Sequence, residues 1–62
     1  MFNRELFIED VSYAGGLQAV SLKADINLKT LEAWHSGTRV PRFISLGGIA
    51  AALGYLPERY FI

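Results

Sequence analysis

The sequence contains potential nucleophiles and acid–base groups, but none of them has the companions that catalysis requires. His35 is the only histidine, there is no cysteine, and no cluster of carboxylates accompanies the imidazole. A metal site needs several such ligands, and an activated serine needs a base and an orienting acid. No such base and acid accompany the serines Ser12, Ser21, Ser36 and Ser45. The sequence therefore predicts no enzyme activity, no metal site and no cofactor, and we expect no small-molecule ligand.

Basic side chains are the second group capable of chemistry, because lysine and arginine bind phosphate. Six basic and six acidic residues cancel over the whole chain, and a zero net charge argues against tight binding to nucleic acid. The distribution is uneven, since acids gather near the start while the middle of the chain is mildly basic. The acids at the start are Glu5, Glu9 and Asp10, whereas residues 17–42 carry Lys23, Lys29, Arg39 and Arg42 against Asp25 and Glu32.

The length of the chain limits what can position these side chains. A chain of 62 residues buries only about 60% of the surface that it exposes when unfolded, so we expect one domain, 1–62, without a deep cleft. The absence of cysteine excludes disulfides, so the core must come from packed helices or from a partner chain. No apolar run has the length of a membrane span, and acids interrupt the N-terminal region where a signal peptide would be apolar. We expect a soluble protein of the cytoplasm.

Caps and apolar spacing predict three helices in the first half of the chain. Asn3 can cap a helix of about residues 4–14, with Leu6, Phe7, Val11 and Ala14 at helical spacing before Gly15 and Gly16. A second helix is expected over residues 17–24, followed by a tight turn at 25–27. Asn27 can then cap a third helix that begins at Leu28, ends near His35 and turns Leu31 and Trp34 inward.

The second half predicts a fourth helix and a short final element. Pro41 can begin the helix, since its missing N–H is not needed in the first turn, and the apolar spacing continues to Leu53 before Gly54. Gly47 and Gly48 weaken this helix by roughly 1 kcal/mol each relative to alanine. We interpret them as a site of close packing by another backbone, with a deliberately soft helix as the alternative. Pro57 opens a last turn or short helix over 58–62, with a β-strand over 59–62 as the alternative.

The order of these features resembles the helix-turn-helix of the phage repressor and Cro family, also called the XRE-like family. The resemblance covers residues 14–54, about two thirds of the chain. The residues that carry it are Val20 and Ser21, Ile26, Thr30 and Leu31, Trp34, Ser36 and Gly37, Pro41, Ile49 and Ala50, and Leu53 and Gly54. It implies an all-α, compact four- to five-helix bundle of the lambda-repressor-like type, with the helix-turn-helix at about 17–36.

The function that the resemblance implies is sequence-specific DNA binding by a transcriptional regulator of phage or mobile-element type, in the bacterial cytoplasm or nucleoid. The recognition helix, 28–36, would enter the major groove of operator DNA. The implied base contacts are Leu28, Lys29, Ala33 and Ser36. The implied phosphate contacts are Gln18, Lys23, Thr38, Arg39 and Arg42.

Two features of the sequence keep a second function open. Family members commonly have a glutamine on the first turn of the second helix, where this chain has Leu17 followed by Gln18. Leu17 and Leu28 are apolar positions at which a protein partner could bind, so the alternative is a protein-interaction module on the same fold, such as an anti-repressor or an inhibitor of a host factor. For a DNA reader we expect a homodimer, and the candidate interface is Leu56, Tyr60, Phe61 and Ile62.

Overall fold

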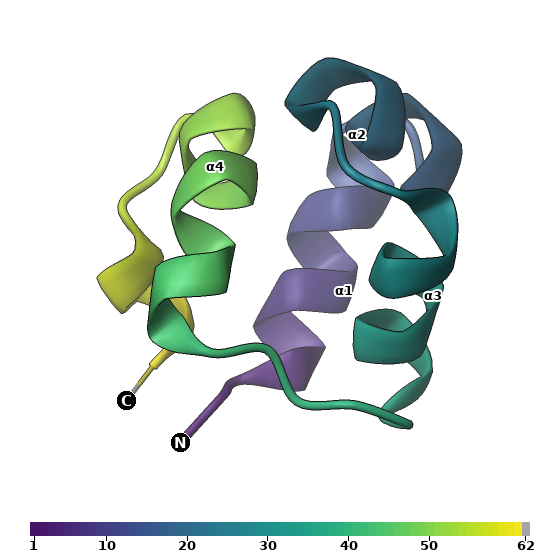
Figure 1. The fold of residues 1–62 in the computed structure, drawn as a ribbon. Helices are drawn as coiled ribbons and strands as arrows, with labels where there is room; N and C mark the ends of the chain where they lie inside the picture. Colours follow the sequence, from purple (N-terminus) through teal and green to yellow (C-terminus); the bar gives the residue numbers. More distant parts are fainter. Residues whose placement is uncertain (62) are drawn as a thin grey trace.

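Residues 1–61 are described by a computed structural model, and four α-helices and a final 3₁₀ turn account for most of them (Figure 1). The elements are α1 (Arg4–Tyr13), α2 (Leu17–Ala24), α3 (Leu28–Ser36), α4 (Phe43–Leu53) and the 3₁₀ helix η1 (Pro57–Tyr60). The predicted all-α bundle is confirmed. Figure 1 shows α1 at the centre, with α2 and α3 on one side of it and α4 on the other.

The predicted caps of the first helix are confirmed. The side chain of Asn3 accepts a hydrogen bond of 3.1 Å from the backbone N–H of Leu6, and this satisfies one of the free donors at the start of α1. At the other end, Gly15 and Gly16 have φ values of 107° and 102°. Only glycine adopts this region without strain, so the helix ends there and the chain turns into α2.

The predicted start of α4 was wrong by two residues. Arg42, not a residue before Pro41, is the N-cap, with an extended backbone of φ −82° and ψ 155°. Pro41 stays outside the helix because the extended backbone of Arg42 separates it from the first helical turn. The proline is buried in the link from α3, where it lines the same groove as Trp34.

The core combines residues of every helix. Its buried members, in chain order, are Phe7, Val11, Val20, Leu31, Trp34, Leu46, Ile49, Ala50 and Tyr60. Phe7 is central, because its ring meets those of Trp34 and Tyr60 edge to face with centroids 6.5 and 5.9 Å apart. Ala14, expected on the inward side of α1, is exposed, since it caps the helix beyond its last turn.

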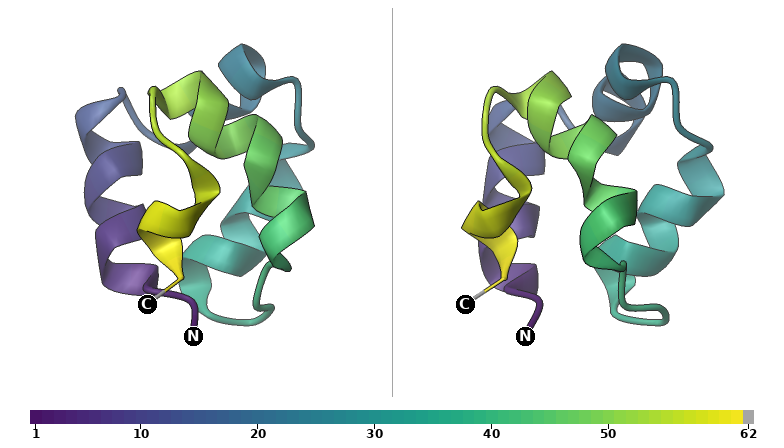
Figure 2. Two further views of the ribbon diagram at one scale, coloured as in Figure 1. Left: turned by 90° about the vertical axis from the view of Figure 1, so that its left-hand side faces the viewer. Right: turned by 60° about the vertical axis from the view of Figure 1, so that its left-hand side comes forward.

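The end of the chain returns to its beginning. After η1, Phe61 forms an isolated antiparallel bridge with Phe2, and the N–H of Asn3 donates to the carbonyl of Tyr60 over 2.7 Å. Figure 2 shows this segment between α1 and α4, with the two ends of the chain close together. The short-helix prediction is thus confirmed as far as Tyr60, and the alternative strand is reduced to one bridge at Phe61 within residues 1–61.

A polar cluster at Asp10 fastens η1 to α1. The carboxylate accepts hydrogen bonds from Arg59, at 2.7 and 3.1 Å, and from the Tyr60 hydroxyl, at 2.7 Å. The hydrogen bonds from Arg59 hold the pKa of Asp10 below its ordinary value of 3.8. Burial of the ring, together with the bond to Asp10, raises the pKa of Tyr60. The hydroxyl therefore remains a donor to a charged carboxylate at neutral pH.

The interpretation of Gly47 and Gly48 as a close-packing site was wrong within this chain. A Cβ atom at either position would meet no other atom within 4 Å. Both glycines face open space on α4 because the buried stripe of that helix is formed by Leu46, Ile49 and Ala50. No neighbouring backbone within residues 1–61 requires glycine at these two positions.

We predict that Asp10→Asn lowers the free energy of unfolding by about 1–2 kcal/mol at neutral pH, because charge-assisted hydrogen bonds to Arg59 and Tyr60 weaken. The folded pKa of Asp10 lies below 3.8, so the wild-type advantage is complete above that pH and is lost as the pH falls through the lowered pKa. Urea unfolding of the wild type and of Asp10→Asn at several pH values measures the difference in their free energies of unfolding. Glu9→Gln, an amide substitution at an exposed neighbour, is the control. Equal stability of the wild type and Asp10→Asn at neutral pH would contradict the assignment.

Candidate nucleic-acid interface

Helix α3 is held so that one side is buried and the other faces outward. Leu31 and Trp34 lie three residues apart and both belong to the core. The side chain of Asn27 caps the helix, accepting a hydrogen bond of 2.8 Å from the N–H of Lys29, and Gly37 ends it with φ 87°. The residues of α3 that do not face the core are therefore fixed in position by a rigid helix.

The turn between α2 and α3 sets the angle of the two helices. Asp25 adopts the left-handed conformation, with φ 55° and ψ 49°, which aspartate tolerates better than most residues. The Ser21 hydroxyl donates forward to the carbonyl of Ile26. The N–H of Ile26 in turn donates to the carbonyl of Ser21 over 3.1 Å. This reciprocal pair closes the turn while Ile26 packs against the core.

Arg4 positions the far end of α3, and the sequence analysis missed it. Its Nε donates to the carbonyl of His35 over 2.8 Å, which satisfies one of the free acceptors at the helix end. The same side chain lies against Gly37, where a Cβ atom would come within 3.2 Å of Nε. No local pattern indicates this contact, because 31 residues separate Arg4 from His35.

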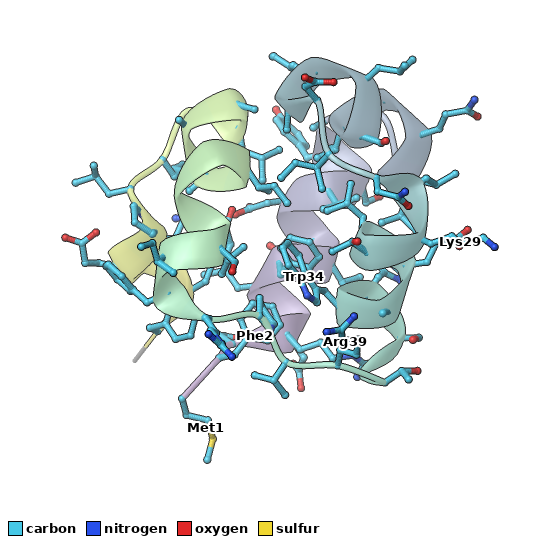
Figure 3. The ribbon with its side chains drawn as sticks, in the orientation of Figure 1. Met1, Phe2, Lys29, Trp34 and Arg39 are labelled. Atoms are coloured by element: carbon cyan, nitrogen blue, oxygen red, sulfur yellow. The ribbon has the colours of Figure 1, made fainter. Side chains whose placement is uncertain are left out.

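The four predicted base-contacting residues lie on the same side of α3, since they avoid the stripe of Leu31 and Trp34. Lys29 is exposed, and Figure 3 shows its side chain directed away from the bundle. Leu28 and Ala33 are half-buried. Ser36 is exposed, but its hydroxyl is already engaged with the Ala33 carbonyl at 3.3 Å and the Thr38 hydroxyl at 2.9 Å.

The predicted phosphate-contacting residues are all exposed: Gln18, Lys23, Thr38, Arg39 and Arg42. Two of them lie on α2, two in the link that follows α3, and one at the N-cap of α4. Two of them form a subgroup, because Arg39 and Arg42 line one groove together with Trp34. Figure 3 places Arg39 near Trp34, whereas Lys29 projects from the other side of α3.

The predicted dimer residues do not form one exposed surface. Leu56 is 71% exposed, but Tyr60 is 0% exposed, and its assignment to an interface was wrong because the ring fills the chain's own core. Phe61 is half-buried between Phe2 and Phe43, with ring centroids 5.8 and 5.6 Å away. Ile62 lies outside the described residues.

Leu17, one of the two predicted anchors for a protein partner, packs against the core and is only partly accessible. The other anchor, Leu28, is half-buried on the outward side of α3. The most exposed large apolar side chains lie elsewhere: Tyr13, Leu22, Val40, Ile44 and Leu56, besides Met1. An apolar partner would therefore meet surfaces that the sequence analysis did not single out.

The described part of the chain contains no group of three or more histidine or acidic side chains placed to hold a metal ion. It also contains no helix with the length and apolar character needed to cross a membrane. Comparison of the chain with protein-family models, with curated proteins and with solved structures gives no match.

We predict that Asn27→Ala lowers stability by about 1 kcal/mol, because the N–H of Lys29 loses its acceptor at the start of α3. Asn27→Ser keeps a side-chain oxygen in the capping position and should retain most of the stability. Hydrogen exchange of the first-turn amides of α3, together with urea unfolding, measures both effects. Equal protection in the alanine and serine variants would show that the cap does not hold this helix.

Proposed function

We propose that the chain is a sequence-specific DNA-binding regulator that inserts α3 into the major groove. The observation that carries the proposal is that α2 and α3 are joined by a tight turn, in which Asp25 has a left-handed backbone. The apolar side of α3 is buried and its other side is presented outward. In a helix-turn-helix reader the second helix supplies base contacts while the first crosses the backbone. A rigid, capped α3 meets this requirement.

The side chains on the outward side of α3 suit the edges of base pairs. Lys29 points away from the bundle (Figure 3) and can donate to O6 and N7 of guanine. Leu28 and Ala33 offer apolar contact to a thymine methyl group. Ser36 has an internal partner in Thr38, so in this proposal it orders the end of the helix as well as facing the DNA.

Phosphate groups would be bound around this helix. Lys23, Arg39 and Arg42 have no ion-pair partner within residues 1–61, so their charges are available to a ligand. Within residues 1–61, the N-caps of α2 and α4, Gly16 and Arg42, make no side-chain cap hydrogen bond, so the first N–H groups of both helices have no side-chain acceptor. N–H groups at a helix start favour anions. Gln18 adds a polar side chain in the first turn of α2, and Thr38 adds one in the link after α3.

The zero net charge is compatible with this function because the charges are segregated. Asp10 and Arg59 neutralise each other in the cluster that fastens η1. Of the other charged residues, Glu5 and Glu9 lie on α1 and Glu58 lies on η1, away from the helix-turn-helix. Residues 17–42 present four lysine and arginine side chains to a DNA backbone that approaches α3, against two acids, Asp25 in the turn and Glu32 on α3. The local field, not the total charge, governs the encounter.

We predict that binding to the DNA upstream of the chain's own gene weakens steeply with salt, with a slope that reports several phosphate contacts. Arg42→Ala should lower affinity for all sequences and reduce that slope by about 1, whereas Lys29→Ala should relax the preference at a guanine by about 1–3 kcal/mol. Fluorescence anisotropy over a salt series, with Glu58→Gln as a charge-changing control, measures this. A folded protein that binds no duplex at low salt would exclude DNA reading.

A homodimer remains part of the proposal, on a smaller surface than the sequence predicted. One copy of α3 covers little DNA, whereas two copies matched to a pseudo-palindromic operator double the contacts. Leu56 and the neighbouring Tyr55 are the exposed apolar residues of the link before η1. Phe61 is a poor site for a test, because a charge there would also disrupt its packing on Phe2 and Phe43.

We predict that Leu56→Asp abolishes self-association and weakens operator binding without unfolding the chain, since the side chain is 71% exposed. Sedimentation equilibrium and circular dichroism measure the two effects. Tyr13→Asp places the same charge at another exposed apolar residue, on α1, and should leave association unchanged. If the Leu56 variant sediments as the wild type does, the dimer uses another surface.

The alternative function, a protein-interaction module that does not read DNA, is favoured by the exposed apolar side chains. Leu22 on α2 and Ile44 on α4 are 78% and 85% exposed. Such a module would show no detectable binding to duplex DNA at low salt, where the electrostatic attraction to phosphate is strongest. The salt series above therefore separates the two functions.

A further inference from the structure

A groove of about 390 Å³ runs between α3 and the start of α4. Trp34 and Pro41, which are both buried, form its floor. The link between the helices and the first turn of α4 supply the sides. The groove is large enough for two or three side chains of a partner, and its floor is preformed because Trp34 belongs to the core.

Two aliphatic side chains beside the groove are unusually accessible. Val40 is 71% exposed and Ile44 is 85% exposed, and both line the groove. Single exposed apolar residues are common, but here two of them adjoin the same concave surface over an aromatic floor. A ligand that covers both would bury apolar surface, which is the main favourable contribution to association.

Two arginines give the groove a positive charge. Arg39 and Arg42 line it, both are exposed, and within residues 1–61 neither forms an ion pair. No acidic side chain is among the lining residues. A guanidinium group binds a carboxylate through two parallel hydrogen bonds, so the groove is complementary to acidic side chains.

We propose that this groove binds a segment of another protein that carries aliphatic side chains next to carboxylates. A nucleic acid backbone would pair with Arg39 and Arg42 but would leave Val40 and Ile44 in water. An acidic and aliphatic peptide satisfies both features. The regulatory consequence rests on the proposed function: the same arginines are candidate phosphate contacts, so the partner would act as an antagonist of DNA binding.

Selection from a random peptide library displayed on phage, with the whole protein as bait, tests the inference. We expect enrichment of peptides that combine leucine, isoleucine or valine with aspartate or glutamate. Trp34 is the only tryptophan and lies in the groove floor, so its fluorescence should report saturable binding of the synthetic form of each enriched peptide.

Matched variants locate the binding. Arg39→Glu and Ile44→Ser should each lower the affinity for the peptide by about fivefold to tenfold. The first variant reverses a charge and the second removes apolar contact. Both residues are exposed, so neither change disturbs the core. Lys29→Glu makes the same charge change on the other side of α3 and should leave peptide affinity unaltered while it weakens operator binding.

The outcomes separate this inference from the function on which its consequence rests. Peptide binding without any DNA binding would support the groove and exclude the regulator. Displacement of operator DNA by the peptide would support both. The inference is overturned by absence of enrichment or by enrichment of basic peptides. It is also overturned if the Arg39 and Ile44 variants bind the peptide as tightly as the wild type does, or if duplex DNA occupies the groove while peptides do not.

Discussion

Asp10 binds Arg59 and Tyr60 and so holds the last turn of the chain against the first helix. The position of α3 depends on this contact through a sequence of packed rings. Tyr60 is fully buried and meets Phe7 edge to face, and Phe7 meets Trp34 of α3 in the same way. In a chain this short, few other residues can close the core. The polar cluster at one end of the molecule therefore supports the helix that presents the candidate interface at the other.

A second constraint is that α3 must bury one side in the core while its opposite side faces outward. Leu31 and Trp34 must be buried, and the helical repeat then directs Lys29 outward. Arg4 and Asn27 hold the two ends of the helix, so its outward side chains keep fixed positions. In the proposed function this rigidity matters more than total charge, because base readout requires side chains within hydrogen-bonding distance of particular atoms.

Trp34 joins the candidate interface to the proposed groove, since it packs in the core and also forms the groove floor. Arg39 and Arg42 lie beside it with no internal partner within residues 1–61. The same two cations are thus suited to phosphate in one proposed complex and to carboxylates in another. Val40 and Ile44 distinguish the two complexes. Burial of their aliphatic side chains would stabilise a complex with a protein partner but would contribute little to binding of a phosphate backbone.

The sequence by itself determined the elements whose signals are local. Asn3 and Asn27 as caps, the glycine stops and the inward Leu31 and Trp34 all depend on neighbours within one or two turns, so the four helices could be predicted. Tertiary structure decided the rest. Tyr60 was predicted at a dimer interface but is buried in the chain's own core, where its hydroxyl donates a hydrogen bond to Asp10, 50 residues away. Pro41 remained outside α4, Gly47 and Gly48 proved to face open space, and Arg4 reached His35, 31 residues away. Contacts between distant residues leave no periodic pattern along the chain, because only the packing of the helices brings them together.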